Sequence, residues 1–248
     1  MLPVPDAAAL RSWFSPERPG PLLHAHVVAT GHGRCRVDRP AGPRLVHAEV
    51  AGNHALRGDP DLLDGFPPDE LTGFVEAPPE FLPALRALDP GVAVWDRIVA
   101  VLPDGADAAG ATGTRAPVRR LSADDASALA ALDPALVWIS DTWGGPAGLA
   151  GTGRAWGAFD GGGLVSVAVP FWVGEDHEDI GVVTEAGYRG RGLSTACAAA
   201  VVADIRARGH RPTWTTSPDN AGSRAVADRL GFVRVREDML YAVRTEIP

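Results

Sequence analysis

The segment 180–195 is the feature that most constrains how this chain can fold. It starts with the apolar run IGVVT, continues through the loop EAGYRGRG, and enters an apolar helix at about Leu193. A strand that passes into a helix through glycines is typical of α/β units. The free N–H groups of the first helical turn, at the positive end of the helix dipole, can bind a pyrophosphate.

The composition of the loop suits such a phosphate site. Gly190 and Gly192 would let the backbone approach phosphate oxygens, because no Cβ stands in the way. Arg189 and Arg191 could add charge-assisted hydrogen bonds. The loop is neither the dinucleotide fingerprint G-x-G-x-x-G nor a Walker loop, and a glycine-rich turn before a helix can also be purely structural.

Two motifs together carry a family resemblance. RGRGLS, which begins at Arg189, resembles the acyl-CoA motif [Q/R]-x-x-G-x-[G/A] of the GNAT superfamily, with Gly192 matching and Ser194 replacing the last small residue. NAGSRAVADRLGF, which begins at Asn220, is similar to the family's N-x-x-S helix that ends in L-G-F and packs beside CoA. The resemblance covers 117–248 well and the first hundred residues hardly at all.

The resemblance implies a GNAT fold: a mixed, mostly antiparallel central sheet with a splayed strand pair and flanking helices, preceded here by a smaller N-terminal α/β region. It implies acetyl-CoA, or another short acyl-CoA, as co-substrate and no metal. The residues that it assigns to the cofactor are Val182, Val183, Thr184, Arg189, Gly190, Arg191, Gly192, Leu193, Ser194, Thr195, Asn220 and Ser223.

Acyl transfer to an amine needs a group that takes the amine proton and a donor for the developing oxyanion. By resemblance, the Val182 N–H would face the acetyl oxygen, and Glu178 falls where the family's histone acetyltransferases carry their glutamate base. Glu178 would share a strand face with Val182, and partial burial would raise its pKa as a base requires. Asp179, His177 and a water chain are the alternatives, and this acidic stretch can also be a solvated loop.

One position departs from the family. Many members carry a tyrosine seven residues after the asparagine, as general acid to the thiolate, and here that position is Ala227. Ser217 and Ser223 are the nearest hydroxyl groups, and a CoA thiolate leaves readily enough that an acid is not obligatory.

The expected function is therefore an acetyl-CoA-dependent N-acyltransferase that moves an acetyl group to a primary amine of a small molecule or an amino terminus by direct attack. The glycines of the loop and Glu178 favour this enzyme. The alternative is a non-catalytic acyl-CoA-binding module that regulates or scaffolds, which the missing tyrosine keeps open.

A break in composition divides the chain. The stretch 103–116, PDGADAAGATGTRA, lacks large apolar residues and reads as a flexible linker between an N-terminal α/β region, 1–102, and the acyltransferase domain, 117–248. The N-terminal region could be a second, degenerate copy of the fold, but it has no second phosphate motif. Strands are predicted at 22–30, 45–50, 92–102, 118–121, 154–159, 163–171, 180–184, 212–216 and 232–243, and helices at 79–88, 122–132, 139–149, 193–208 and 221–230.

Charge and composition restrict the partners. The net charge of −8 argues against a nucleic-acid surface and is compatible with a cationic amine. The apolar runs are too short to cross a hydrocarbon layer of ~30 Å, so no membrane is expected. No signal peptide is evident, and two isolated cysteines without a CxxC pattern predict a reduced, cytoplasmic protein. The oligomeric state is left open, a homodimer included.

Histidine and tryptophan side chains remain ambiguous. The histidines at 24, 26, 32, 47 and 54 lack the carboxylate or cysteine spacing of a metal site. Trp138, Trp143, Trp156 and Trp172 fall in segments that line the acceptor side in the family, although tryptophans of this kind are commonly core residues.

Overall fold

All strands of the protein belong to one sheet. The computed structural model describes residues 1–67, 70–106 and 117–248, and twelve strands follow one another in the order β1-β2-β3-β4-β5-β12-β6-β11-β10-β9-β8-β7. The first half of the chain contains β1 (Leu2–Val4), η1 (Ala7–Trp13), α1 (Leu23–Thr30), β2 (Arg34–Val37), β3 (Leu45–Val50), β4 (Asn53–Gly58), η2 (Pro60–Gly65), β5 (Gly73–Glu76), η4 (Pro79–Phe81), α2 (Leu82–Leu88) and β6 (Ala93–Val101).

The second half follows the same plan. It contains β7 (Val118–Arg120), η5 (Ala123–Asp125), α3 (Ala126–Ala130), η6 (Pro134–Trp143), α4 (Pro146–Thr152), β8 (Trp156–Asp160), β9 (Gly163–Val173), β10 (His177–Thr184), η7 (Ala186–Tyr188), α5 (Leu193–Ala207), β11 (Arg211–Thr216), α6 (Ala221–Leu230) and β12 (Val233–Val243). In each half, a first strand and helical turns precede three antiparallel strands, a parallel fourth strand, a helix and a last strand. The chain thus repeats one fold, with the long helix α5 replaced in the first half by the short η2.

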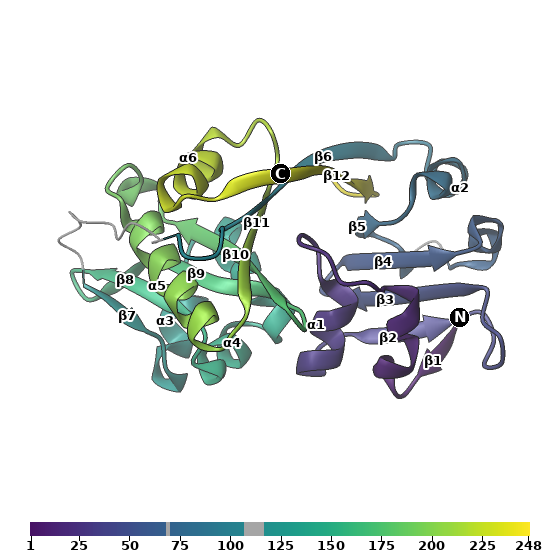
Figure 1. Ribbon diagram of the computed structural model, residues 1–248, viewed down its shortest axis with the longest axis horizontal. Coiled ribbons are helices and arrows are strands. Elements are labelled where there is room, and N and C mark those ends of the chain that lie inside the picture. The colour runs from purple at the N-terminus through teal and green to yellow at the C-terminus, as the bar shows by residue number, and fades with distance from the viewer. Residues whose placement is uncertain (68–69, 107–116) are drawn as a thin grey trace.

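The two halves exchange their last strands. The strand β6, from the first half, pairs with β11 of the second, while β12 pairs with β5 of the first. The exchanged strands also pair with each other and cross the middle of the molecule between the two halves (Figure 1). The predicted boundary falls between β6 and β7, but these shared hydrogen bonds run across it. Most of the predicted linker, 107–116, lies outside the described residues.

The helix that follows the glycine–arginine loop is explained by its composition. The stretch LSTACAAAVVADIRA combines good helix formers with an apolar face, and Cys197, Val201 and Ile205 of α5 are completely buried against the sheet. The helix ends before Gly209, whose φ of +84° suits the left-handed position after a helix. A second core, on the other face of the sheet, packs η6 and α4 against β9.

Most predicted elements are confirmed, and one is wrong. The predicted strand at 22–30 is the helix α1. The apparent alternation in LLHAHVVAT came from His24 and His26, which are buried, with Nε2 atoms 2.9 Å from the carbonyls of Ala7 and Thr142. A helix that is buried on several sides has no polar face, so its sequence does not show the 3.6-residue alternation of an amphipathic helix. The informative signal was the glycine at 31, which ends the helix at φ +72°.

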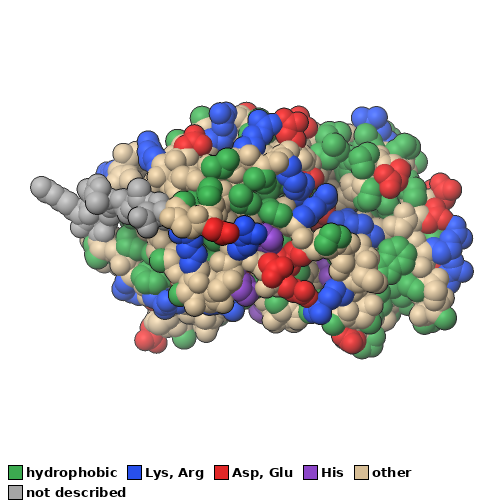
Figure 2. Space-filling model, in the orientation of Figure 1, with side chains coloured by type: hydrophobic (Ala, Val, Ile, Leu, Met, Phe, Trp, Pro, Cys, Tyr) green, Lys and Arg blue, Asp and Glu red, His purple; other side chains and the backbone are tan. Residues whose placement is uncertain are grey.

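Charged groups are distributed without a large field of one sign on the face shown in Figure 2, where acidic and basic side chains are interspersed. Among the described residues, no helix is long and apolar enough to cross a membrane.

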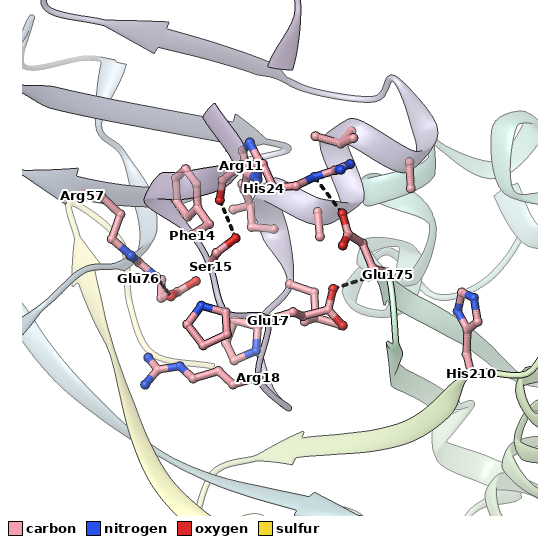
Figure 3. A pocket seen from close by; sticks show the side chains of 18 residues that line it. Arg11, Phe14, Ser15, Glu17, Arg18, His24, Arg57, Glu76, Glu175 and His210 are labelled. Carbon is pink, nitrogen blue, oxygen red and sulfur yellow. Dashed lines mark hydrogen bonds and ion pairs between the residues drawn. The ribbon is translucent and has the colours of Figure 1, made fainter. Parts of the chain in front are cut away.

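Glu17 holds the two halves together at the turn between β9 and β10. Its carboxylate accepts hydrogen bonds from the backbone N–H groups of Glu175, Asp176 and His177 at 2.6, 3.0 and 2.9 Å, and lies 3.0 Å from the His177 ring. Figure 3 shows the contact with Glu175. Burial alone would raise the pKa of Glu17, but these hydrogen bonds outweigh it, and the net effect lowers the pKa from 4.5 to about 2. A residue of the first half therefore fixes the start of β10.

Replacement of Glu17 by glutamine should lower the free energy of unfolding at pH 7 by about 2 kcal/mol, since an amide cannot accept all four bonds. Because the folded pKa lies below the ordinary value of 4.5, this stabilisation is present above pH 4.5 and disappears as the pH falls towards 2. Urea unfolding of wild type and Glu17→Gln at several pH values measures it. Glu175→Gln, at an exposed residue of the same turn, is the control, and a difference between wild type and Glu17→Gln that does not shrink with pH would contradict the assignment.

Candidate active site

The strands β10 and β11 separate partway along their length. They pair in parallel only over His177–Asp179 and Arg211–Thr213, although β10 continues to Thr184 and β11 to Thr216. Beyond Asp179 the β11-facing edge of β10 is therefore free of sheet hydrogen bonds. This is the splayed strand pair that the sequence predicts.

The register of β10 shows which backbone groups face this opening. Glu185 N–H donates to Val165 O at 3.0 Å, so these two residues form a hydrogen-bonded pair. Hydrogen-bonded and non-hydrogen-bonded pairs alternate in an antiparallel ladder, so the Val182–Ala168 pair is of the second kind. The N–H of Val182 consequently points away from β9, into the opening, where a donor for an oxyanion would have to lie.

A cleft of about 860 Å³ opens at the mouth of the splay. Every cofactor-contacting residue named by the sequence resemblance lines it, from Val182 to Thr195 and from Asn220 to Ser223. Further lining residues were not assigned to the cofactor by the sequence, and Leu136, Tyr188 and Arg229 are examples. Leu136 comes from η6, outside both motifs. Trp138, which the sequence places in a segment of the acceptor side, lines the same cleft.

The glycines of the loop leave open space above the backbone. Gly190 and Gly192 have φ of +75° and +76°, and a Cβ at either would meet nothing within 4 Å. Gly192 is also the residue that precedes the first turn of α5. An anionic group can therefore approach the N–H groups of the helix start, which is the arrangement that a CoA pyrophosphate requires. The residues present fit this co-substrate.

The neighbouring polar residues hold the helix starts in place. Thr184 Oγ1 lies 2.7 Å from both Ser166 Oγ and Ser194 Oγ, so Ser194 connects α5 to the end of β10. Asn220 Oδ1 accepts a hydrogen bond from the Ser223 N–H at 2.9 Å and caps α6. The Ser223 hydroxyl accepts one from Trp214 Nε1 at 2.9 Å.

Glu178 lies in a buried ion-pair network. Its side chain is completely buried, and Arg208 Nη2 and Nε lie 2.7 and 3.0 Å from its two carboxylate oxygens. Arg154 adds a contact of 3.5 Å, and His210 Nδ1 lies 3.0 Å away but outside hydrogen-bond geometry. An arginine in bidentate contact stabilises the ionised carboxylate and occupies its oxygens. This geometry gives no support to the prediction that Glu178 is the base. Neither Glu178 nor its neighbour Asp179 is among the residues that line the cleft.

The next residue, Asp179, has the opposite environment. It lies at the last residue of β10 that pairs with β11, and only 4% of its surface is exposed. Burial raises its pKa to about 6, although hydrogen bonds from Thr213 and Thr215 lower it in part. Both threonine hydroxyls donate to Oδ1, at 2.6 and 2.9 Å. Oδ2 has no partner among the described residues and is not completely buried, so it is the oxygen left to take a proton.

Other singled-out residues are structural. Ala227 lies on the buried face of α6, and Ser217 is buried just after β11. Trp138 is 42% exposed at the cleft, whereas Trp143 and Trp172 are buried. The described residues contain no group of three or more histidine, cysteine, aspartate or glutamate side chains that could hold a metal ion. The two cysteines are buried and unpaired.

A second cavity, of about 310 Å³, lies between the first half and the β9–β10 turn (Figure 3). Its charged groups largely satisfy one another: Arg11 pairs with Glu175 at 2.7 Å, Arg57 pairs with Glu76, and the Glu17 carboxylate is occupied by the turn. It opens neither to the splay nor to the glycine–arginine loop.

Comparisons with known proteins agree with this geometry. Residues 119–241 match the family model described as GNAT acetyltransferase. An uncharacterized N-acetyltransferase in the mutA 5′ region of Streptomyces virginiae is 39% identical over 216 residues, which cover 84% of this chain and 89% of that protein. The chain therefore belongs to the GNAT family and is an N-acetyltransferase.

Solved structures resemble both halves of the chain. A GCN5-related N-acetyltransferase-like protein from Streptococcus suis has a TM-score of 0.75 at 16% identity, and the match covers 96% of this chain and 98% of that one. A tandem GNAT protein from the clavulanic acid biosynthesis pathway has a TM-score of 0.56 at 16% identity, covering 97% and 96%. At such identities the likeness shows the fold alone, and it includes the first hundred residues.

Gly192→Ala should raise the dissociation constant of CoA about 30-fold, because the new methyl group would displace a phosphate oxygen from a charge-assisted hydrogen bond worth about 2 kcal/mol. Calorimetric titration with CoA measures this constant.

Gly209→Ala is the matched control, because Gly209 has a φ of +84° and equally open space, but lies at the far end of the same helix. Both variants carry the strain of a left-handed alanine, and only the first should lose affinity. Equal affinities for CoA would remove the phosphate site from the α5 start.

Proposed function

We propose that the protein transfers the acetyl group of acetyl-CoA, or another short acyl group, to a primary amine of a small molecule or an amino terminus by direct attack. The single observation that supports this best is the splay itself, which brings the free Val182 N–H and the start of α5 to one cleft, with Asp179 at the last paired residue just before the strands part. The glycine–arginine loop and α5 would hold the pyrophosphate, and the free edge of β10 would bind the pantetheine.

Each of the chain's own groups has a distinct role in this reaction. The Val182 N–H would donate to the carbonyl oxygen as the amine nitrogen forms a bond to the carbonyl carbon. Asp179 Oδ2 would take the proton that the amine loses, directly or through one water molecule. The carbon–sulfur bond then breaks, and the thiolate leaves without a dedicated acid, since Ala227 provides none. The acetylated amine and CoA are the products.

Asp179→Asn should lower kcat/KM at pH 8 by a factor of about 10²–10³, because the amide cannot take a proton. Asn Oδ1 can still accept both threonine hydroxyls, so the site should keep its shape. The wild-type rate should rise with pH through about 6 and then level off, and the variant should lack this rise. Initial rates from pH 5 to 8.5 test it, and an unaltered profile in the variant would eliminate Asp179 as the base.

Asp179→Asn should lower activity but raise the free energy of unfolding. The folded pKa of Asp179 lies above its ordinary value of 3.8, so the free energy of unfolding falls as the pH rises from about 4 to about 6. Asp179→Asn should therefore be more stable than wild type at pH 8, by up to about 3 kcal/mol, and equal to it near pH 4. Thermal unfolding at both pH values separates this from simple misfolding.

Glu178→Gln is the informative counterpart, because the two carboxylates are adjacent in sequence. It leaves Arg208 without its bidentate partner and should lower the melting temperature by several degrees. The pH–rate profile of Glu178→Gln should keep the wild-type inflection near pH 6. A profile without that inflection would return the role of base to Glu178.

The alternative function, a CoA-binding module without turnover, is separated by following free thiol. The full-length protein is incubated with acetyl-CoA and a panel of primary amines. Amine-dependent thiol release supports the enzyme; tight CoA binding without release on any amine would support the module.

A further inference from the structure

Strand exchange brings an arginine of the first half beside the splayed strands. Arg97 lies on β6, next to Ile98, which pairs with Thr216 of β11. Alternate residues of a strand share a face, and Val99, two residues along, pairs with Thr215, whose hydroxyl donates to Asp179. Arg97, Thr215 and Asp179 therefore lie on one face of the sheet. Arg97 is two strands from β10 in the strand order, and the gap between β11 and β10 is open at this level because their pairing ends at Asp179 and Thr213.

Its level along the strands matches that of the proposed acyl site. Asp179 is paired with Thr213, so two residues further on Gly181 is level with Thr215 and with Val99. Two residues further along each strand, Arg97 of β6 is level with Val183 of β10. Arg97 is therefore on the β6 side of β11, level with the part of β10 that is no longer paired with β11, and its Nη2 reaches the Thr215 carbonyl.

Three carboxylates, Asp179, Asp238 and Asp219, act electrostatically on the charge of Arg97, but none lies within ion-pair distance of it. It has one long hydrogen bond, from Nη2 to Thr215 O at 3.4 Å, and its Nε is completely buried without a partner. No carboxylate of the described residues forms an ion pair with it. By contrast, four other half-buried arginines each contact a carboxylate: Arg36, Arg57, Arg208 and Arg236. Burying an arginine without a partner is unfavourable, so a ligand group is the natural complement.

Aromatic packing fixes the orientation of the guanidinium. Its central carbon lies 4.0 Å from the ring centroid of Trp95, and Trp95 packs against Phe74 at 5.1 Å. A guanidinium held flat against one ring keeps the N–H donors along its edge free, and these match a carboxylate in bidentate geometry. Burial lowers the pKa of Arg97 to about 10, so the group stays cationic at neutral pH.

We propose that Arg97 binds a carboxylate of the acceptor, and that the acceptor is accordingly an amino acid: a primary amine that carries a carboxylate. The amine lies at the splay, near Asp179 and the Val182 N–H, while the carboxylate lies against the guanidinium edge. This rests on the proposed function, and it makes a residue of the first half responsible for substrate choice in the second.

The test compares amines in matched pairs, each an amino acid and a counterpart that lacks the carboxylate, such as glycine with glycinamide and 4-aminobutyrate with butylamine. Thiol release gives kcat/KM for both members. We expect wild type to prefer the carboxylate member of at least one pair, and the chain length of the best pair to report the distance between the two groups. Arg97→Gln should lower the ratio of the two kcat/KM values about 100-fold, mainly through KM, as loss of a bidentate pair implies.

Arg234→Gln is the control, because Arg234 is exposed on β12 and pairs with Glu237. It should keep the wild-type ratio, and Arg97→Lys should fall between wild type and Arg97→Gln. Removal of a buried charge that forms no ion pair among the described residues should not lower the melting temperature, whereas removal of a purely structural arginine would.

The outcomes separate this inference from the proposed function. Turnover of neutral amines with no preference for their carboxylate partners, or an equal loss for both members in Arg97→Gln, would overturn the role of Arg97 and leave the acyltransferase standing. Absence of thiol release with every amine, with or without a carboxylate, would overturn both the role of Arg97 and the proposed function.

Discussion

The parting of β10 from β11 after three paired residues is the constraint on which the site depends. If the two strands remained paired, the Val182 N–H would be consumed by the sheet, and no opening would exist beside the start of α5. Asp179 lies at the last paired position, where the strands still exclude solvent. Sheet geometry thus produces both the free backbone donor and the buried carboxyl group.

The closed end of the splay is held by charge and by the first half of the chain. Glu178, Arg208 and Arg154 form a buried network at this end, and Glu17 binds the backbone of the turn just before it. The exchanged strands β6 and β12 then join the two sheets into one. The first half is therefore part of the framework that keeps the strands paired at one end and open at the other.

The adjacent carboxylates Glu178 and Asp179 lie on opposite faces of β10 and have different surroundings. Glu178 points to the side of α5, where arginines occupy its oxygens, and Asp179 points to the other, where only hydroxyls donate to it. The oxygens of Glu178 are occupied by arginine, whereas burial beside hydroxyl donors raises the pKa of Asp179 into the range of a base. Sequence spacing alone assigned the role to Glu178, because resemblance aligns positions and not their surroundings.

The sequence by itself determined the local features: the glycine–arginine loop between strand and helix, the capped helix at Asn220, and the family. The residues that it predicts for the cofactor all line one cleft. The local features follow from short-range patterns, since glycine, capping residues and apolar periodicity act over a few positions. Only the tertiary structure decided that 22–30 is a buried helix and that the halves exchange strands. It also decided that arginine contacts Glu178 whereas only hydroxyl groups contact Asp179, and that Arg97 lies on the strand beside β11. Each of these depends on which distant residues become neighbours, and burial and charge compensation are set by that neighbourhood.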